Sequence, residues 1–250
     1  MGIILTDRML EYYCSKKGNA SAIKLYQPSQ PIPSMSITQY GNILASFWVY
    51  GAGSGCIIRH GEADNVNGMT FTLYKTATNE LYVSANTSNV GPFHYYPMLS
   101  GVPVTANGWT HVLFGIFGSE CYIWINGTTK YSGTMGVYGR YYSVISPLKL
   151  FSNNTAQIYS SSEGCVIDDL WVYPNVSEAY YVNIRDLAKP PVLQWYMHNS
   201  NPYDANWKGY RFNEGFGLSA ARADKPTDST YSIVISNSNR WEATNIPQIV

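Results

Sequence analysis

Short runs of alternating or β-branched hydrophobic residues recur along the chain, and Gly, Asn, Ser and Pro separate them. Runs with a period of two, bounded by turn-forming residues, predict antiparallel strands packed as a β-sandwich. In residues 109–117 both alternating faces are largely apolar, so this strand is expected at the centre of a sheet. The predicted strands are residues 22–26, 43–50, 56–60, 69–75, 81–85, 109–117, 121–125, 148–151, 166–173 and 231–236.

The strongest hairpin signal is the pair Asn126 and Gly127, which follows the alternating residues 121–125. A type I′ turn requires positive φ at both of its central residues, and Asn and Gly adopt that conformation most readily. The sequence therefore predicts a tight hairpin at this pair.

One segment has a helical pattern. Ser177 can cap its first turn, and Val176 can pack against Tyr181 as a hydrophobic staple. Apolar residues continue at helical spacing to Lys189, after which the double proline 190–191 ends the helix. The apolar positions are Tyr180, Ile184 and Leu187.

The double proline is also the predicted domain boundary, which divides the chain into an N-terminal segment 1–19, a sandwich 20–189 and an extension 190–250. The extension has too few Leu, Ile and Val to close a core of its own. Its aromatic residues are typical interface anchors, which favours an assembly role, and covering a face of its own sandwich is the alternative. The expected anchors are Trp195, Trp207, Tyr210, Phe212 and Trp241.

Composition limits the partners. Sixteen Lys and Arg balance sixteen Asp and Glu, so an electrostatic grip on nucleic acid or anionic lipid is not expected. Charged residues are only 13% of the chain, whereas 22 Tyr and 7 Trp raise the aromatic share to 15%. Part of this aromatic surplus must lie on the surface, which suits adhesion or assembly. Residues 1–11 lack the pattern of a secretory signal, and no apolar run is long enough for membrane insertion.

Four cysteines, Cys14, Cys56, Cys121 and Cys165, lie far apart without a CxxC spacing. This pattern excludes a zinc knuckle and favours free buried thiols over disulfides.

Three motifs occur in order between residues 20 and 188. They are Phe47-Trp48-Val49; Gly108-Trp109-Thr110-His111-Val112 with Tyr122-Ile123-Trp124-Ile125-Asn126-Gly127; and Ile167-Asp168-Asp169-Leu170-Trp171-Val172-Tyr173 with Ser177-Glu178. The segment resembles the laminin-G-like branch of the concanavalin A-like lectin/glucanase superfamily. The resemblance implies an all-β jelly roll of two curved antiparallel sheets, with ligands bound on the concave face or at rim loops.

The superfamily's glycosidases place paired carboxylates on one strand face, and no such motif is present. Asp168 and Asp169 are adjacent, so they are expected on opposite faces and cannot act as a pair. The expected role of Asp168 is to accept hydrogen bonds from a neighbouring loop. Trp48, Trp109 and Trp171 are interpreted as core residues, and His111 as a hydrogen-bonded sheet residue. We therefore predict no catalytic residues.

Candidate binding residues are aromatic. Trp124 and Tyr122 share a strand face that is either open to ligands or buried under the extension. The segments 92–97 and 136–142 are predicted as long loops that carry recognition or pack locally, with Tyr95, Tyr96, Tyr138 and Tyr141 as their binding residues. No cofactor is required. One oxygen-rich loop could bind calcium, and the alternative is a solvated turn without a metal ion. The candidate calcium ligands are Glu62, Asp64, Asn65 and Asn67.

The sequence thus favours a non-catalytic virion surface or structural protein, such as a phage tail, fibre or capsid-decoration component. It would act as a homo-oligomer or beside other virion proteins and adhere to host-surface glycans. The alternative is a soluble, extracellular glycan-binding module, and a glycoside hydrolase comes third.

Overall fold

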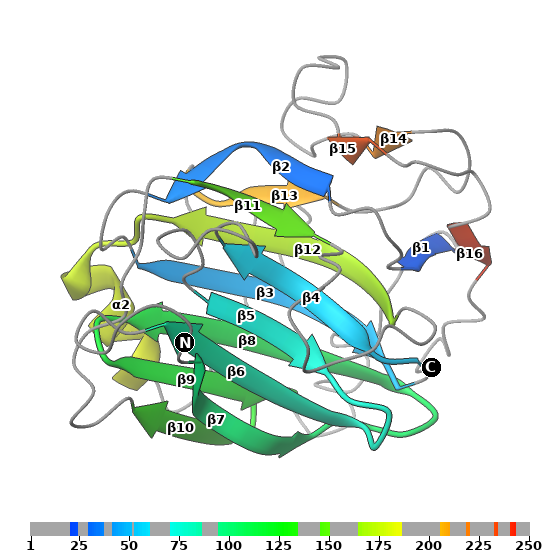
Figure 1. Ribbon diagram of the computed structural model, residues 1–250, viewed down its shortest axis with the longest axis horizontal. Coiled ribbons are helices and arrows are strands. Elements are labelled where there is room, and N and C mark those ends of the chain that lie inside the picture. The colour runs from blue at the N-terminus through cyan, green and yellow to red at the C-terminus, as the bar shows by residue number, and fades with distance from the viewer. Residues whose placement is uncertain are drawn as a thin grey trace, which may run out of the picture.

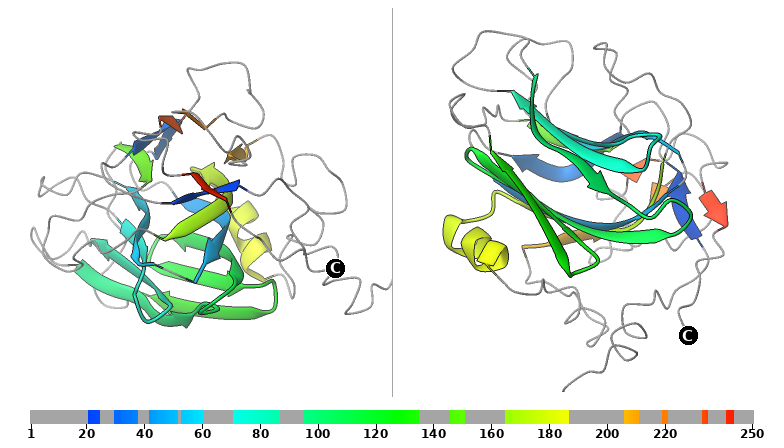
Figure 2. Two further views of the ribbon diagram at one scale, coloured as in Figure 1. Left: turned by 90° about the vertical axis from the view of Figure 1, so that its right-hand side faces the viewer. Right: turned by 90° about the horizontal axis from the view of Figure 1, so that it is seen from below.

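The computed structural model of the chain describes twelve segments. They are residues 21–24, 30–37, 42–51, 53–60, 71–86, 95–134, 146–150, 165–186, 206–210, 219–220, 233–234 and 241–243. Two antiparallel sheets within these segments stack face to face (Figure 1), and Figure 2 shows the same layers from two further sides. The predicted all-β sandwich is therefore confirmed.

The eight-stranded sheet carries the features discussed below. Seven of its strands follow in the spatial order β10 (Thr129–Thr134), β9 (Glu120–Ile125), β8 (Trp109–Phe117), β3 (Ile43–Tyr50), β12 (Val166–Pro174), β1 (Ser21–Lys24) and β16 (Trp241–Ala243). The eighth, β13 (Lys208–Tyr210), pairs with β12 beside this path. Strand β8 lies between β3 and β9 with both faces buried, as its apolar pattern predicts.

The six-stranded sheet has the order β2 (Gln30–Ile37), β11 (Ser146–Leu150), β4 (Gly55–His60), β5 (Phe71–Lys75), β6 (Glu80–Asn86) and β7 (Tyr95–Pro103). Its two edge strands contain Pro31, Pro33, Pro97 and Pro103. Proline cannot donate to a strand ladder and is tolerated at sheet edges, which is why the sequence pattern did not predict β2 and β7. A separate two-stranded sheet joins β14 (Ser219–Ala220) to β15 (Ile233–Val234).

The main core lies between the two large sheets. Phe47, Val112 and Phe114 contribute to it from the eight-stranded sheet, and Phe71 and Leu73 contribute from the six-stranded sheet. The Phe71 and Phe114 rings meet with centroids 5.7 Å apart. Alternate residues of β3 and β8 point away from this core, so the outer face of the eight-stranded sheet is free to form a second layer.

Both local sequence signals are confirmed. Asn126 and Gly127 have φ angles of 49° and 67°, as the predicted turn requires. The helix α2 (Glu178–Asp186) begins after Ser177, whose Oγ accepts a hydrogen bond from the Tyr180 N–H at 3.3 Å. The predicted end of the helix, at residue 189, lies outside the described residues.

Two described parts of the extension join the eight-stranded sheet, through β13 and β16. Trp207 and Tyr210 are buried within the chain itself, Trp207 on the outer face and Tyr210 in the main core. Their predicted role as anchors for a neighbouring subunit is not supported, because neither side chain is exposed. The alternative role, in which the extension covers its own sandwich, fits residues 206–210. Trp195 and Phe212 lie outside the described residues, and the role of Trp241 stays a prediction.

Cys56, Cys121 and Cys165 form no disulfide; Cys121 and Cys165 are buried, as expected, whereas Cys56 is half-buried. Cys14 lies outside the described residues. Burial raises the pKa of Cys121 and of Cys165 to about 12, so both thiols stay protonated and unreactive. No helix in the described part of the chain is long and apolar enough to cross a bilayer.

Candidate binding site

The outer face of the eight-stranded sheet carries a second hydrophobic cluster, which packs beneath α2. The strands supply large aromatic side chains, α2 supplies two more residues, and Trp207 comes from the extension. Its buried members are Leu44, Leu113, Tyr122, Trp124, Trp171, Val176, Tyr181, Ile184 and Trp207. This cluster fixes α2 against the sheet, because burial of large apolar side chains is the main stabilising contribution to packing.

Tyr122 lies across its neighbouring strand because β8 has a glycine there. Gly115 pairs with Tyr122, and a Cβ at Gly115 would lie 2.9 Å from both Tyr122 Cζ and Leu44 Cδ2. On its other side the Tyr122 ring contacts Tyr181 of α2, with centroids 5.1 Å apart. A glycine in the middle of a strand is thus the sequence signal for a close approach at this point.

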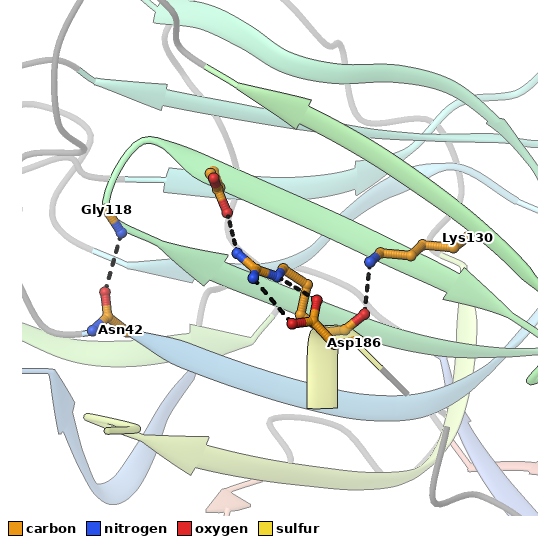
Figure 3. A network of polar contacts seen from close by, with 6 residues as sticks. Asn42, Gly118, Lys130 and Asp186 are labelled. Carbon is orange, nitrogen blue, oxygen red and sulfur yellow. Dashed lines mark hydrogen bonds and ion pairs between the residues drawn. The ribbon is translucent and has the colours of Figure 1, made fainter. Parts of the chain in front are cut away.

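Asn42 fixes the start of α2. Its Oδ1 accepts a hydrogen bond from the Gly118 N–H at 3.2 Å, in the turn between β8 and β9 (Figure 3). Its backbone carbonyl accepts from the Val176 N–H at 3.2 Å, just before the helix. One residue, through its side chain and its backbone, thereby connects the hairpin turn to the segment that leads into α2.

Charged residues hold the other end of α2 to the hairpin of β9 and β10. Arg185 donates from Nη1 to Glu120 Oε2 at 3.1 Å, and from Nε to Asp186 Oδ1 at 2.8 Å. Lys130 Nζ donates to the Arg185 carbonyl at 2.6 Å, and Figure 3 shows Lys130 reaching to this end of the helix. A cation at the last carbonyls of a helix is favourable because they carry the negative end of the helix dipole.

A pocket of about 350 Å³ lies between β9, β10 and α2. Tyr122 and Tyr181 form its buried base, and exposed or half-buried polar residues form its rim. The described residues that line it are Glu120, Cys121, Tyr122, Lys130, Ser132, Gly133, Thr134, Tyr181 and Arg185. The lining residues of β9 and β10 lie opposite each other, since Tyr122 at the base pairs with Ser132 and Glu120 pairs with Thr134.

The two tyrosines at the base have buried hydroxyls. Neither Tyr122 Oη nor Tyr181 Oη has a hydrogen-bond partner within the described structure. A buried polar group left unpaired costs about 1–3 kcal/mol, so its presence beside a pocket needs an explanation. Burial raises the pKa of both hydroxyls far above the usual tyrosine value, so they stay protonated and able to donate.

Lys130 also lies over the aromatic residues next to the pocket. Its Nζ is 5.5 Å from the centroid of the Tyr122 ring and 5.6 Å from that of Trp124. Both distances are within the range of a cation–π contact. Lys130 therefore forms a wall of the pocket, and within the described part of the chain the Arg185 carbonyl takes one of its three N–H donors.

The structure places the predicted binding residues in different environments. Trp124 and Tyr122 are only 5% and 1% exposed, so the open-face hypothesis is wrong for both, although Tyr122 lines the pocket from below. Tyr95 and Tyr96 lie on strand β7, which corrects the predicted loop. Tyr138 and Tyr141 lie outside the described residues, as do the predicted calcium ligands Glu62, Asp64, Asn65 and Asn67. The residues that the structure does describe contain no cluster suited to a metal ion.

The motif residues are structural. Trp48 and Trp171 are buried, whereas Trp109 is half-buried against Tyr50. His111 is buried and hydrogen-bonded, with its Nε2 2.9 Å from Ser46 Oγ. Sequence reasoning did not single out Lys130, Ser132 or Arg185 for the pocket, because only the packing of α2 on the hairpin brings them together.

Asp168 is also fully buried. Its Oδ1 accepts a hydrogen bond from the adjacent Asp169 N–H at 2.7 Å, and the expected hydrogen bond from a neighbouring loop stays a prediction. Asp169 has a φ of 46°, and the pairing of β12 with β3 shifts register between Asp168 and Trp171. This irregularity is a β-bulge, so simple alternation of faces does not apply to the two carboxylates.

No protein-family model matches the chain, and no curated protein matches it in sequence. Solved structures do match. A candidate carbohydrate-binding protein from Bacteroides ovatus aligns with a TM-score of 0.54 and 11% identity, over 91% of this chain and 61% of its own. An SAP-like pentraxin from Limulus polyphemus aligns with a TM-score of 0.44 and 11% identity, over 66% and 81%. Tailspike protein 2 of the Escherichia coli O157:H7 bacteriophage CAB120 aligns with a TM-score of 0.42 and 15% identity, over 70% and 29%. The chain has a concanavalin A-like jelly-roll fold.

Proposed function

We propose that the chain is a non-catalytic carbohydrate-binding module and that its site is the pocket between β9, β10 and α2. The observation that carries the proposal is the pair of buried hydroxyls of Tyr122 and Tyr181 at the base of this pocket, neither of which has a hydrogen-bond partner among the described residues. A ligand rich in hydroxyl groups can approach such donors and also bond the polar rim. The fold supports the proposal in outline, since a structural neighbour from Bacteroides ovatus is a candidate carbohydrate-binding protein.

The groups around the pocket support a non-catalytic role. Hydrolysis of a glycosidic bond requires two carboxyl groups on opposite sides of that bond. Among the described residues that line the pocket, Glu120 is the only carboxylate, and its Oε2 is bonded to Arg185.

The setting of the module remains as the sequence predicts it: the surface of a virion, as one of several copies, with an extracellular module as the alternative. A glycan-binding module is what a particle needs to adhere to a host surface. Mass spectrometry of purified particles would identify the chain among virion proteins, and its absence from every particle fraction would leave the extracellular alternative.

A glycan array with the purified full chain tests the binding function, and a paired substitution locates the site. Ser132→Tyr places a ring into the pocket from an exposed strand position, whereas Thr129→Tyr adds the same ring elsewhere on β10. We expect Ser132→Tyr to abolish glycan binding while its melting temperature stays near that of the parent. Thr129→Tyr should bind normally. Equal binding by both variants would place the site elsewhere, and an array without any signal would reject the function.

A further inference from the structure

We infer that the pocket selects a neutral sugar and discriminates against sugars that carry a carboxylate. This inference rests on the proposed function and names the ligand class of the same site. It follows from how the charges and hydrogen-bonding groups around the pocket are arranged.

The charges around the pocket compensate one another. Arg185 is paired with Glu120 and with Asp186, and Lys130 is the second cation at this end of α2. Two cations thus face two carboxylates. Hydrogen bonds from Arg185 lower the pKa of Asp186, so this carboxylate keeps its charge at any pH where a sugar would bind. Taken together, these four side chains at the end of α2 carry no net charge that would attract an anion, with Asp186 paired to Arg185 beside the pocket and not among its lining residues.

The rim also offers both kinds of hydrogen-bonding group. Glu120 provides carboxylate oxygens on an exposed side chain, while Lys130 provides N–H donors and Ser132 a hydroxyl. A sugar hydroxyl donates and accepts, so it can use each of these groups. A ligand carboxylate can only accept, and it would meet the like charge of Glu120, which is the kind of repulsive contact that gives an interface its specificity.

The size of the pocket limits how much of a glycan it holds. A volume of about 350 Å³ lies at the lower end of the range of ~300–1,000 Å³ that is typical of small-molecule sites. Such a pocket accommodates one or two sugar rings. The pocket therefore contacts a short stretch of a glycan rather than a long chain.

Isothermal titration calorimetry with matched sugars tests the inference. The probes are the methyl glycosides of glucose and glucuronic acid, and of galactose and galacturonic acid, because each pair differs only by the carboxylate. At low ionic strength we expect the neutral member of a binding pair to bind about fivefold more tightly, since a like-charge contact at the surface costs up to about 1 kcal/mol. Added salt should reduce this preference.

A variant identifies the source of the preference. Glu120→Gln removes the repelling charge and keeps the shape, so the ratio between neutral and acidic members should fall towards one. Glu80→Gln, on the six-stranded sheet, is the matched control and should leave the ratio unchanged. Equal or tighter binding of the acidic members by the parent chain, or array signals confined to glycans with acidic ends, would overturn the inference and leave the proposed function intact. If no glycan of either kind binds, the proposed function fails as well.

Discussion

Asn126 and His111 exchange two hydrogen bonds at the end of the β9 hairpin. Asn126 Oδ1 accepts from the His111 N–H at 2.8 Å, and the Asn126 N–H donates to the His111 carbonyl at 2.9 Å. The turn residue thus continues the ladder of β8 beyond the last residue of β9. The side chain of Asn126 and its tolerance of a positive φ both contribute to the stability of the chain. Substitution can separate the two contributions.

We expect Asn126→Ala to destabilise the chain by about 2 kcal/mol and Asn126→Gly by about 1 kcal/mol. Alanine loses the side-chain hydrogen bond and also meets the cost of a left-handed conformation, whereas glycine loses only the bond. Urea unfolding curves of the three proteins measure the difference. Equal losses in the two variants would show that the positive φ of Asn126 carries no cost.

Stability should fall as the pH is lowered below about 6.5. Burial lowers the pKa of His111 from 6.5 to about 3, so the folded chain keeps this imidazole neutral while the unfolded chain protonates it. The unfolded state then binds more protons, and the free energy of unfolding decreases towards acid, by about 2 kcal/mol at pH 5 for this one group.

Thermal unfolding between pH 4 and pH 8 tests this, with His111→Gln as the comparison. The variant should be less stable at pH 7, because it disturbs the contact with Ser46, yet its stability should depend less on pH. A variant with the same pH slope as the parent would assign the acid sensitivity to other groups.

Two glycines should respond unequally to alanine. At Gly115 the new methyl group would meet the ends of two side chains, which can shift, so we expect a loss of about 1–3 kcal/mol. At Gly133 it would collide with the backbone carbonyl of Met98 in β7, which cannot move without displacing a strand. Gly133→Ala should therefore be the more damaging change. Denaturation midpoints would give the order, and the reverse order would contradict the packing of β10 on β7.

Deleting residues 191–250 should expose the outer cluster and abolish cooperative unfolding. The deletion removes Trp207 and β13, and a Cβ at Gly209 would collide with the Trp171 ring, which shows how closely this strand covers it. Differential scanning calorimetry and light scattering of the truncated chain would show a broad transition and aggregation. A sharp transition in a monomeric truncated protein would instead support the assembly role of the extension.

A milder version replaces Trp207 with Phe. Trp207 Nε1 donates to Tyr180 Oη at 3.0 Å. Trp207→Phe keeps most of the ring packing and loses this hydrogen bond, so the free energy of unfolding should fall by about 1 kcal/mol. Trp207→Ala also leaves a cavity and should lose about 3–5 kcal/mol. Chemical denaturation of both variants would separate the two contributions, and similar losses would show that packing of the ring is unimportant.

Elements that depend on neighbouring residues were predictable from the sequence. The turn at Asn126 and the cap at Ser177 depend on local backbone preference. The two apolar faces of strand β8 predict its central position in the sheet. Elements that exist only through tertiary contacts were not predictable. Strand β13 has three residues and forms because β12 offers it a partner.

In the candidate site, too, features set by neighbouring residues were predictable and features set by tertiary contacts were not. Tyr122 was identified from the alternation of its strand, but its burial could not be, because α2 covers it from a distant part of the chain. Tyr181 and Arg185 are four residues apart and therefore lie on one face of a helix, although nothing in this spacing indicates which strand they meet. The bulge at Asp169 likewise escapes a rule of strict alternation, since Asp gives only a weak signal for positive φ.

Strands β1 and β16 pair side by side although they come from opposite ends of the described chain (Figure 1). Such a contact closes a very long loop, and pairings between remote segments slow folding. During synthesis β1 can join β12 before β16 leaves the ribosome. For that interval the outer edge of β1 has no partner, and an unpaired edge can recruit a strand from another nascent chain. The interval before β16 emerges is thus one in which this edge can recruit another chain, so slower elongation through the segment before β16 should lower the yield of folded protein.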